Sequence, residues 1–434
     1  MSDDSVQSFA VVGGDGFLGS TLVKALLARY PSASVASLDV VQRHFPDQLK
    51  SGERKWTFYT ADLTSLDSLA SAIKQSGAKT VFHTASPWTG SGADVCEKVN
   101  VQGTQTVVDA CVQEGVKKLV FTSSAGTVYN GNDLINVDER LPFPEEVLDP
   151  YNVTKAKAEE IVLKANGKNG LLTVALRPAG IFGPGDRQAL PGVMEVLKSG
   201  KTAFQVGSNE NLFDWTYVDN VVHAHLLAAE RLHLSIPLTK LDERISPIDL
   251  TVPRRQLPTS TFRPESLLER EKELDPSFEN DPHGDAPLLA ARHRFDQYFP
   301  ATVKSQLGLS DEDDSVPVAG QAYFITNGEP VPFWDFPRAV WAEYNGHVPK
   351  WTIALPAFVG LAIAGLAETV MGFLGKTPNM TRGKIVYSTV NRYYNIEKAR
   401  RILGYEPIVG VEEGIKRAVA WYKENESTMQ PKKA

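Results

Sequence analysis

The stretch VVGGDGFLG, residues 11–19, decides the fold of this 434-residue chain. Its glycines Gly13, Gly16 and Gly19 separate a short apolar run from a helical pattern. Gly13 permits a tight turn, Gly16 lets the backbone approach a pyrophosphate, and Gly19 lets the helix pack closely on the strand. The free N–H groups of the first helical turn then attract the anion. The stretch therefore predicts a strand, a dinucleotide-binding turn and a helix.

An acidic residue follows the glycines at the sequence spacing that is typical of dinucleotide-binding proteins. Asp39 ends the next apolar run, 20 residues after Gly19. A carboxylate there accepts a hydrogen bond from a ribose 2′-hydroxyl, which favours NAD over NADP. Arg43 keeps NADP open, because an arginine at this place can meet a 2′-phosphate. Asp62, after the third run, is expected either to contact the adenine or to cap the end of its strand.

Short β-branched runs alternate with helix-length segments over the first part of the chain. Strands are expected at 9–12, 34–38, 56–60, 80–84, 118–123 and 172–177, with a helix at 20–30. The stretch 213–232 begins as a loop or strand and continues as an Ala/Leu-rich helix. This alternation predicts an α/β protein with a Rossmann-type, doubly wound parallel sheet over residues 1–238.

The composition changes after residue 238. Residues 239–316 hold 8 of the 27 prolines, 16 acidic and 10 basic residues, so we interpret them as a Pro-rich charged insertion. Pieces such as PESLLEREKELDP, residues 264–276, are expected to form short helices. A strand at 322–326 then opens a smaller C-terminal substrate-binding part, 317–434. An amphipathic helix at 410–426 closes it.

A long apolar stretch, residues 351–375, lies in this C-terminal part and carries a single charge, Glu368. A membrane-spanning helix needs about 20 uninterrupted apolar residues, whereas Pro356 and three glycines interrupt this stretch. A segment lying on or partly inserted in a membrane surface is therefore favoured. Helices buried in the smaller part and a true span are the alternatives.

Charge and cysteine content exclude several classes. The net charge of −7 argues against nucleic acid as a partner. Cys96 and Cys111 form no disulfide framework and match no metal spacing, so no metal is expected and a reducing location is favoured. The first residues show no secretory signal pattern.

A second group of reactive side chains lies at the end of the fifth strand and in the following helix. The run TSS, residues 122–124, precedes YNVTK, residues 151–155. Tyr151 and Lys155 share one face of a helix. A nearby ammonium lowers the pKa of a phenol from about 10, which makes the tyrosine a usable base near neutral pH. A serine at the strand end can hold the substrate oxygen.

These residues resemble the extended short-chain dehydrogenase/reductase superfamily, through GGDGFLG, Asp39, NVQGT (100–104), TSS, YNVTK and RPAGIFGPGD (177–186). DWTYVDNVVHAH (214–225) and FITNGEPVPFWDF (324–336) resemble its 3β-hydroxysteroid dehydrogenase branch. More narrowly, the chain resembles the decarboxylating dehydrogenases of sterol C4 demethylation. The resemblance implies NAD-dependent oxidation of the 3β-hydroxyl of a 4α-carboxysterol, with decarboxylation.

The resemblance also implies roles for single residues. Tyr151 is the expected acid/base, Lys155 tunes it and binds ribose, and Ser124 orients the hydroxyl, with Ser123 as the rival. The residues expected to bind the cofactor are Gly13, Gly16, Phe17, Leu18, Gly19, Asp39, Asp62, Tyr151, Lys155 and Pro178. Candidate cations for the substrate carboxylate are Arg177 and Arg187, while structural roles are expected for His83, Trp88, His223 and His225.

The implied partners are a sterol substrate and the cytosolic face of the endoplasmic reticulum membrane. Other C4-demethylation enzymes and a second copy of the chain stay open as partners. A 3β-hydroxysteroid dehydrogenase/isomerase and a triterpenoid-pathway dehydrogenase are alternatives that use the same three residues. A non-catalytic NAD-sensing scaffold is the alternative from another class, although such a protein has no need of Ser124, Tyr151 and Lys155.

Overall fold

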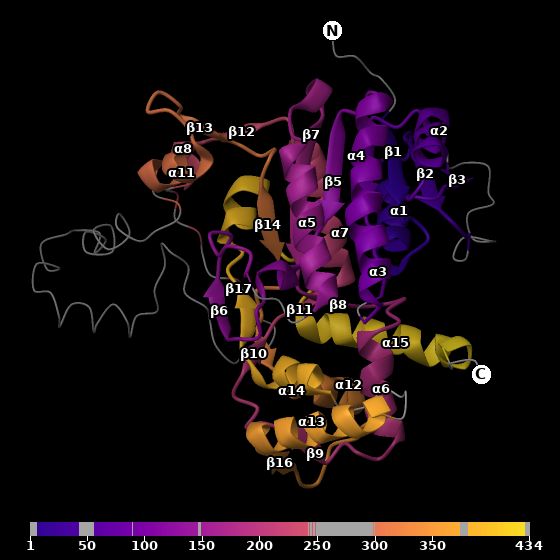
Figure 1. The fold of residues 1–434 in the computed structure, drawn as a ribbon, viewed down its shortest axis with the longest axis vertical. Coiled ribbons are helices and arrows are strands. Elements are labelled where there is room, and N and C mark those ends of the chain that lie inside the picture. Colours follow the sequence, from indigo (N-terminus) through magenta and orange to yellow (C-terminus); the bar gives the residue numbers. More distant parts are fainter. Residues whose placement is uncertain are drawn as a thin grey trace, which may run out of the picture.

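The structure of the protein is a computed structural model, which describes residues 7–42, 56–88, 90–145, 149–241, 243, 245, 248, 298, 300–373 and 381–429. Its centre is a seven-stranded parallel sheet in the order β14-β7-β5-β4-β1-β2-β3 (Figure 1). The strands are β1 (Ser8–Val12), β2 (Ser34–Asp39), β3 (Trp56–Thr60), β4 (Thr80–His83), β5 (Lys118–Thr122), β7 (Leu172–Pro178) and β14 (Ala322–Ile325). The predicted Rossmann-type sheet is confirmed, and each expected strand lies within one residue of its expected bounds.

Helices cover both faces of this sheet. One face carries α1 (Phe17–Arg29) and α7 (Val218–Arg231), and the other α2 (Leu66–Ser76), α4 (Gly103–Gln113) and α5 (Pro150–Lys164). Along β1, Phe9 and Val11 pack into the core on the first face, while Ala10 and Val12 pack into the core on the second. The central strands are apolar throughout because both of their faces are buried.

The winding of the chain reverses between β1 and β4. Val12, at the end of β1, pairs with Leu38 of β2 on one side and with His83 of β4 on the other. In an open α/β sheet, a crevice forms at the carboxyl ends of the strands where the winding reverses, and ligands bind there. The ends of β1, β4 and β5 therefore position the candidate site.

A smaller lobe lies below this edge of the sheet in Figure 1. It contains a four-stranded sheet, β15-β10-β17-β6, and the pairs β8-β11 and β9-β16. Its strands are β6 (Leu134–Val137), β8 (Gly180–Phe182), β9 (Phe204–Val206), β10 (Leu212–Phe213), β11 (Trp215–Tyr217), β15 (Val331–Pro332), β16 (Ile353–Leu355) and β17 (Arg392–Tyr394). Apart from the strand or loop expected at 213, the sequence analysis missed them, because such short strands show no readable alternation.

The helices of this lobe are α6 (Ala189–Lys198), α12 (Asp335–Asn345), α13 (Ala357–Phe373), α14 (Arg382–Thr389) and α15 (Val411–Met429). The expected C-terminal amphipathic helix corresponds to α15 and packs against α12. Its Val411, Ile415 and Ala418 are buried in the main core.

The ends of the Pro-rich insertion lie side by side. β12 (Ser235–Pro237) pairs antiparallel with β13 (Ser315–Pro317), and α8 (Leu238–Leu241) and α11 (Pro300–Leu307) flank the pair. The helices expected at 264–276 fall outside the described residues, as does Arg43.

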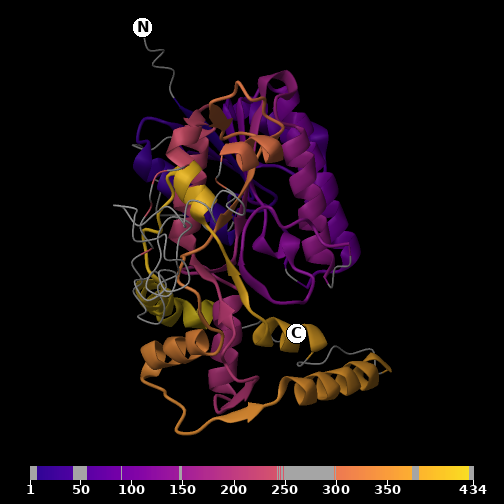
Figure 2. The same cartoon turned by 90° about the vertical axis from the view of Figure 1, so that its left-hand side faces the viewer.

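The apolar stretch at 351–375 forms the short strand β16 followed by α13. Figure 2 shows α13 at the end of the molecule opposite the N-terminus, reaching beyond the neighbouring helices. Phe358 is 74% exposed and Leu366 is 68% exposed. The alternative prediction, that this helix is buried in the smaller part, is therefore wrong for its outer face. Among the helices that the structure describes, none is both long and apolar enough to cross a membrane.

Candidate active site

The glycine turn between β1 and α1 has the close geometry that the sequence analysis predicted. Gly13 has φ +79°, and a Cβ there would lie 2.7 Å from the Cα of Ala85. A Cβ on Gly19 would lie 2.1 Å from the carbonyl oxygen of Gly13. Gly16 precedes the first residue of α1, and no side chain caps that end of the helix. The turn therefore presents backbone N–H groups, as a dinucleotide pyrophosphate requires.

Asp39 lies beside this turn at the carboxyl end of β2. Its Oδ2 accepts a hydrogen bond from the backbone N–H of Asp15 at 3.1 Å, and its Oδ1 accepts one from Val40 at 2.8 Å. A carboxylate held next to the glycine turn fits the hydroxyls of an adenosine ribose. The glycine turn and Asp39 together fit a dinucleotide.

Three other residues expected to bind the cofactor have different surroundings in the structure. Leu18 is buried in the core, so its backbone alone faces the turn. Pro178 ends β7 and pairs with Ile325 at the same edge of the sheet. The Asp62 carboxylate accepts hydrogen bonds from the N–H and hydroxyl of Thr64, each at 2.8 Å. This contact favours the interpretation of Asp62 as a local cap.

The three expected catalytic residues come from two neighbouring segments. Ser124 follows β5 and precedes the 3₁₀ turn η2 (Ala125–Val128), while Tyr151 and Lys155 lie one turn apart in α5. A Cβ on Gly126 would lie 2.2 Å from Oδ1 of Asn152, so the η2 turn packs directly against the start of α5. This packing brings the serine loop beside Tyr151.

The two serines of the TSS run point in different directions. Ser123 is buried, and its hydroxyl donates to Oε2 of Glu159 at 2.6 Å. Ser124 is partly exposed, and its Oγ accepts a hydrogen bond from the backbone N–H of Gly126 at 3.0 Å. The Ser124 O–H is therefore oriented away from that contact and can donate to a ligand, whereas the Ser123 O–H is engaged within the protein.

The charges around Tyr151 differ from the expectation. Nζ of Lys155 donates to the carbonyl oxygen of Thr122 at 2.6 Å and lies 4.2 Å from the centre of the Phe121 ring. Burial lowers the pKa of Lys155 to about 7. Burial also raises the pKa of Tyr151 above its usual range, against a smaller opposite effect of the Ser86 hydroxyl. The expected lowering of the Tyr151 pKa is wrong for this arrangement, because burial is the largest effect and the nearby Asp149 carboxylate raises the pKa further.

The sequence analysis assigned no role to two polar residues that contact this site. The hydroxyl of Ser86 lies 3.5 Å from that of Tyr151 and donates to Oδ1 of Asn100 at 3.2 Å. Nδ2 of Asn100 donates to Oγ1 of Thr154 at 3.0 Å. Asn100 lies in a π-helical turn, η1 (Glu97–Gln102), a distortion frequent at functional sites. The position of Ser86 just after β4 could have identified it.

Two of the histidines that were expected to be structural are buried and neutral. Nε2 of His83 lies 3.0 Å from Oγ1 of Thr104, and burial lowers its pKa to about 3. His225 contacts the Thr122 hydroxyl at 2.7 Å, and burial lowers its pKa to about 4. Trp88 differs from its expected packing role, because it is 60% exposed.

The two arginines expected to bind a substrate carboxylate have other surroundings. Arg177 is buried, and its Nη2 pairs with Oε1 of Glu159 at 2.6 Å. This ion pair joins β7 to α5 and neutralises both charges. Arg187 is exposed on the loop before α6. Neither residue provides a buried cation without a counter-charge.

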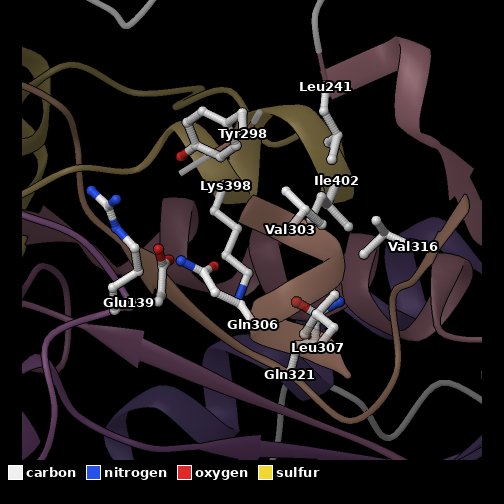
Figure 3. Close-up of a pocket in the computed structure, with 11 residues that line it drawn as sticks. Glu139, Leu241, Tyr298, Val303, Gln306, Leu307, Val316, Gln321, Lys398 and Ile402 are labelled. Atoms are coloured by element: carbon white, nitrogen blue, oxygen red, sulfur yellow. The ribbon is translucent and has the colours of Figure 1, made fainter. Parts of the chain in front are cut away.

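A pocket of about 410 Å³ lies at the outer edge of the sheet, beside β14 and α11. In the view of Figure 3, Lys398 runs through its middle, with Glu139 on one side and Val303 and Ile402 on the other. Nζ of Lys398 donates to the carbonyl oxygen of Ala322, the first residue of β14, at 2.9 Å. This pocket is therefore separate from the carboxyl edge that carries Tyr151.

The fold and this site define a dinucleotide-binding dehydrogenase of the extended short-chain type: a glycine turn with an acid beside it, then serine, tyrosine and lysine at the same sheet edge. Residues 10–245 match the model of the 3-beta hydroxysteroid dehydrogenase/isomerase family. The chain belongs to this family.

Relatives and solved structures agree with this assignment. The chain is 38% identical to the decarboxylating sterol-4-alpha-carboxylate 3-dehydrogenase of Saccharomyces cerevisiae, over 96% of this chain and 99% of the relative. It is 30% identical to the protein of that name from Homo sapiens, over 98% of this chain and 90% of the relative. A UDP-glucose 4-epimerase from Thermus thermophilus, solved with NAD, shares the fold with a TM-score of 0.58 at 19% identity, over 96% and 98% of the two chains.

Proposed function

We propose that this protein oxidises the 3β-hydroxyl of a 4α-carboxysterol with NAD and releases the carboxyl group as carbon dioxide. The observation that carries this proposal is the placement of Ser124, Tyr151 and Lys155 beside a dinucleotide-binding turn. The relatives named for this reaction match this chain along nearly its whole length, which supports the same substrate class.

The residues of the carboxyl edge divide the binding of the dinucleotide among themselves. The glycine turn and the first N–H groups of α1 would hold the pyrophosphate, and Asp39 would hold the adenosine ribose. Asp39 favours NAD over NADP because a carboxylate repels a 2′-phosphate. When bound, the nicotinamide supplies the hydride acceptor.

The protein residues handle the proton and the alcohol oxygen. Tyr151 in its phenolate form accepts the proton of the 3β-hydroxyl while the hydrogen on C3 leaves with its electron pair, and the product is a 3-ketone. Because burial raises the pKa of Tyr151, this form depends on a cationic neighbour. Ser124 donates a hydrogen bond to the same oxygen and fixes its position. Lys155 supplies a cationic neighbour on the same helix face when it is protonated.

The second step needs no additional catalytic group. A ketone at C3 makes the C4 substituent a β-keto acid, so the electrons of the bond to the carboxyl carbon flow into the ketone oxygen as carbon dioxide leaves. The hydroxyls of Ser124 and protonated Tyr151 would stabilise the resulting enolate oxygen. C4 then takes up a proton.

We also propose that α13 contacts the cytosolic face of the endoplasmic reticulum membrane. Phe358, Ile363, Leu366 and Val370 are between 48% and 74% exposed along this helix. An exposed apolar surface of this kind is typical of an interaction site, and a sterol substrate is itself dissolved in lipid. Glu368 pairs with Arg382 at 2.8 Å, which neutralises the acidic charge within this surface.

Product analysis tests the substrate class. The purified protein is incubated with NAD and either a 4α-carboxy-3β-hydroxysterol or a 3β-hydroxy-5-ene steroid, and the products are identified by mass spectrometry. We expect a 3-ketosterol without the carboxyl carbon from the first substrate. Oxidation of the second substrate alone, with migration of its double bond, would instead favour a dehydrogenase/isomerase, an activity after which the family is named.

A further inference from the structure

Arg392 is a buried cation between aromatic rings in β17. Its Cζ lies 4.0 Å from the centre of the Tyr129 ring and 4.8 Å from that of Tyr387. The Phe213 ring centre lies 5.5 Å away. The residue is 9% exposed. The rings stabilise the charge of the guanidinium, which still needs hydrogen-bond acceptors for its N–H groups.

No carboxylate forms an ion pair with Arg392 in the described part of the chain, and its Nε has no hydrogen-bond partner there. Asp214, the acid that follows its paired strand, forms no ion pair with Arg392 among the described residues, and its Oδ2 accepts a hydrogen bond from the backbone N–H of Tyr394 at 2.9 Å. The Tyr394 hydroxyl is a polar neighbour of the guanidinium, but a neutral phenol provides no counter-charge. A buried charge in such surroundings is typical of a group that pairs with an anionic ligand.

The position of Arg392 connects two regions with roles in the proposed function. Tyr129, whose ring centre lies 4.0 Å from the guanidinium, directly follows the η2 turn that begins after Ser124. Tyr387 lies in α14, which packs against the exposed helix α13. The guanidinium therefore contacts both the segment that follows Ser124 and the helix that supports α13, so a sterol that extends from α13 to Ser124 would pass near it.

We propose that Arg392 binds the carboxylate of the substrate and thereby selects 4α-carboxysterols over sterols without this charge. This inference rests on the proposed function. A guanidinium packed between ring faces presents its N–H groups at its edges, in the plane that a carboxylate needs for two parallel hydrogen bonds. Arg177 is already neutralised by Glu159, and Arg187 is exposed, so neither offers an equivalent site.

Arg392 is expected to contribute to substrate binding and not to the rate of carbon dioxide release. A cation that pairs with the carboxylate stabilises it relative to carbon dioxide, and therefore gives no acceleration of carbon dioxide release. The loss of Arg392 should raise the Kd and KM of the carboxysterol and leave kcat nearly unchanged.

The test compares two sterols that differ only at C4, one with a 4α-carboxyl and one with a 4α-methyl group. Their Kd values are measured in detergent with NAD present, for the wild-type protein, Arg392→Met, and the control Arg417→Met. Arg417 is a surface arginine of α15 that pairs with Glu413 at 2.7 Å. The preference for the carboxysterol is the Kd of the methylsterol divided by the Kd of the carboxysterol. We expect this ratio to fall about ten- to hundredfold in Arg392→Met, with unchanged binding of the methylsterol and of NAD.

The proposal would be overturned if Arg392→Met kept the wild-type preference, or if its affinity for both sterols fell by the same factor. If this variant does not fold, Arg392→Lys provides the test, because it keeps the charge between the rings but cannot donate two parallel hydrogen bonds. In Arg392→Lys the preference for the carboxysterol should fall roughly tenfold. A preference equal to that of the wild-type protein would contradict the proposal. These binding measurements need no turnover, so a failure of the proposed reaction remains distinguishable from a failure of this inference.

Discussion

Two adjacent serines show how much a single side-chain direction decides in this site. Ser123 and Ser124 have the same chemistry, and the sequence analysis favoured Ser124 by its place in a motif. In the structure, the Ser123 hydroxyl binds the buried carboxylate of Glu159, while Ser124 lies at the accessible end of the strand. The two residues should therefore fail in different ways when each is replaced.

Ser124→Ala should lower kcat for the carboxysterol about a hundredfold, because one hydrogen bond to the developing charge is lost. Ser123→Ala should keep most of the turnover but lower the free energy of unfolding by about 1–3 kcal/mol, because Glu159 loses a buried hydrogen bond. Steady-state kinetics and urea unfolding of both variants check these expectations. The reverse pattern would assign the catalytic hydroxyl to Ser123.

Asp214 gives the protein a defined pH dependence of stability. Burial raises its folded-state pKa from 3.8 to about 7. The folded state therefore holds this proton more tightly than the unfolded state, and the associated stability is lost as the pH rises from about 4 to about 7.

Asp214→Asn removes this titration. We expect the free energy of unfolding of the variant, relative to wild type, to increase by on the order of 2–4 kcal/mol between pH 4 and pH 7 and to level off above pH 7. Denaturant unfolding at several pH values measures it, with Asp67→Asn on the surface of α2 as the control. A difference that does not change with pH would contradict a raised pKa of Asp214.

At the scale of elements, the glycine turn is the part that local sequence predicted best. Its geometry depends on contacts within a few residues and on Ala85, which follows the adjacent strand β4. The short strands of the lobe were missed because their pairing joins residues far apart in the chain, such as Phe213 with Arg392. No local pattern records such a pairing, and for the same reason the burial of Arg392 became visible only in the structure.

Gly19→Ala should disrupt the turn, because the added Cβ would lie 2.1 Å from the carbonyl oxygen of Gly13. We expect NAD affinity to fall at least tenfold, since the backbone that receives the pyrophosphate must move. Gly192→Ala in α6 is the matched control, because a Cβ there meets no atom within 4 Å. It should leave NAD binding unchanged and stabilise the helix by about 0.5–1 kcal/mol. Equal NAD affinity of the two variants, measured by calorimetry, would argue against the role of this turn.

The exposed face of α13 makes a separate prediction. Phe358→Glu with Leu366→Glu should weaken binding to phosphatidylcholine vesicles at least tenfold, because each apolar side chain contributes about 1.5–3 kcal/mol when it leaves water. Ile408→Glu, at a residue that is 59% exposed outside α13, is the control. Flotation of the three proteins with vesicles measures binding. Retained flotation of the double variant would disprove contact through α13.

At the scale of the whole molecule, the sequence predicted the sheet and the residues at its carboxyl edge, and it left the second lobe undefined. The motifs that identify the family lie along the strands and first turns, where local pattern and fold agree. The charges depend on burial by distant segments, and this is why the expected lowering of the Tyr151 pKa was wrong. The second copy of the chain and the partner enzymes stay predictions, which the molar mass from light scattering would begin to test.

The central claim is an oxidation at C3 that leads to decarboxylation. The direct measurement follows NADH absorbance and released carbon dioxide together, with a 4α-carboxy-3β-hydroxysterol labelled at its carboxyl carbon. We predict equal amounts of both products from the wild-type protein and a loss of about 10²–10⁴-fold in their rate for Tyr151→Phe, with NAD binding retained. NADH without carbon dioxide would contradict the decarboxylation, and the absence of both products from a protein that binds NAD would contradict the account as a whole.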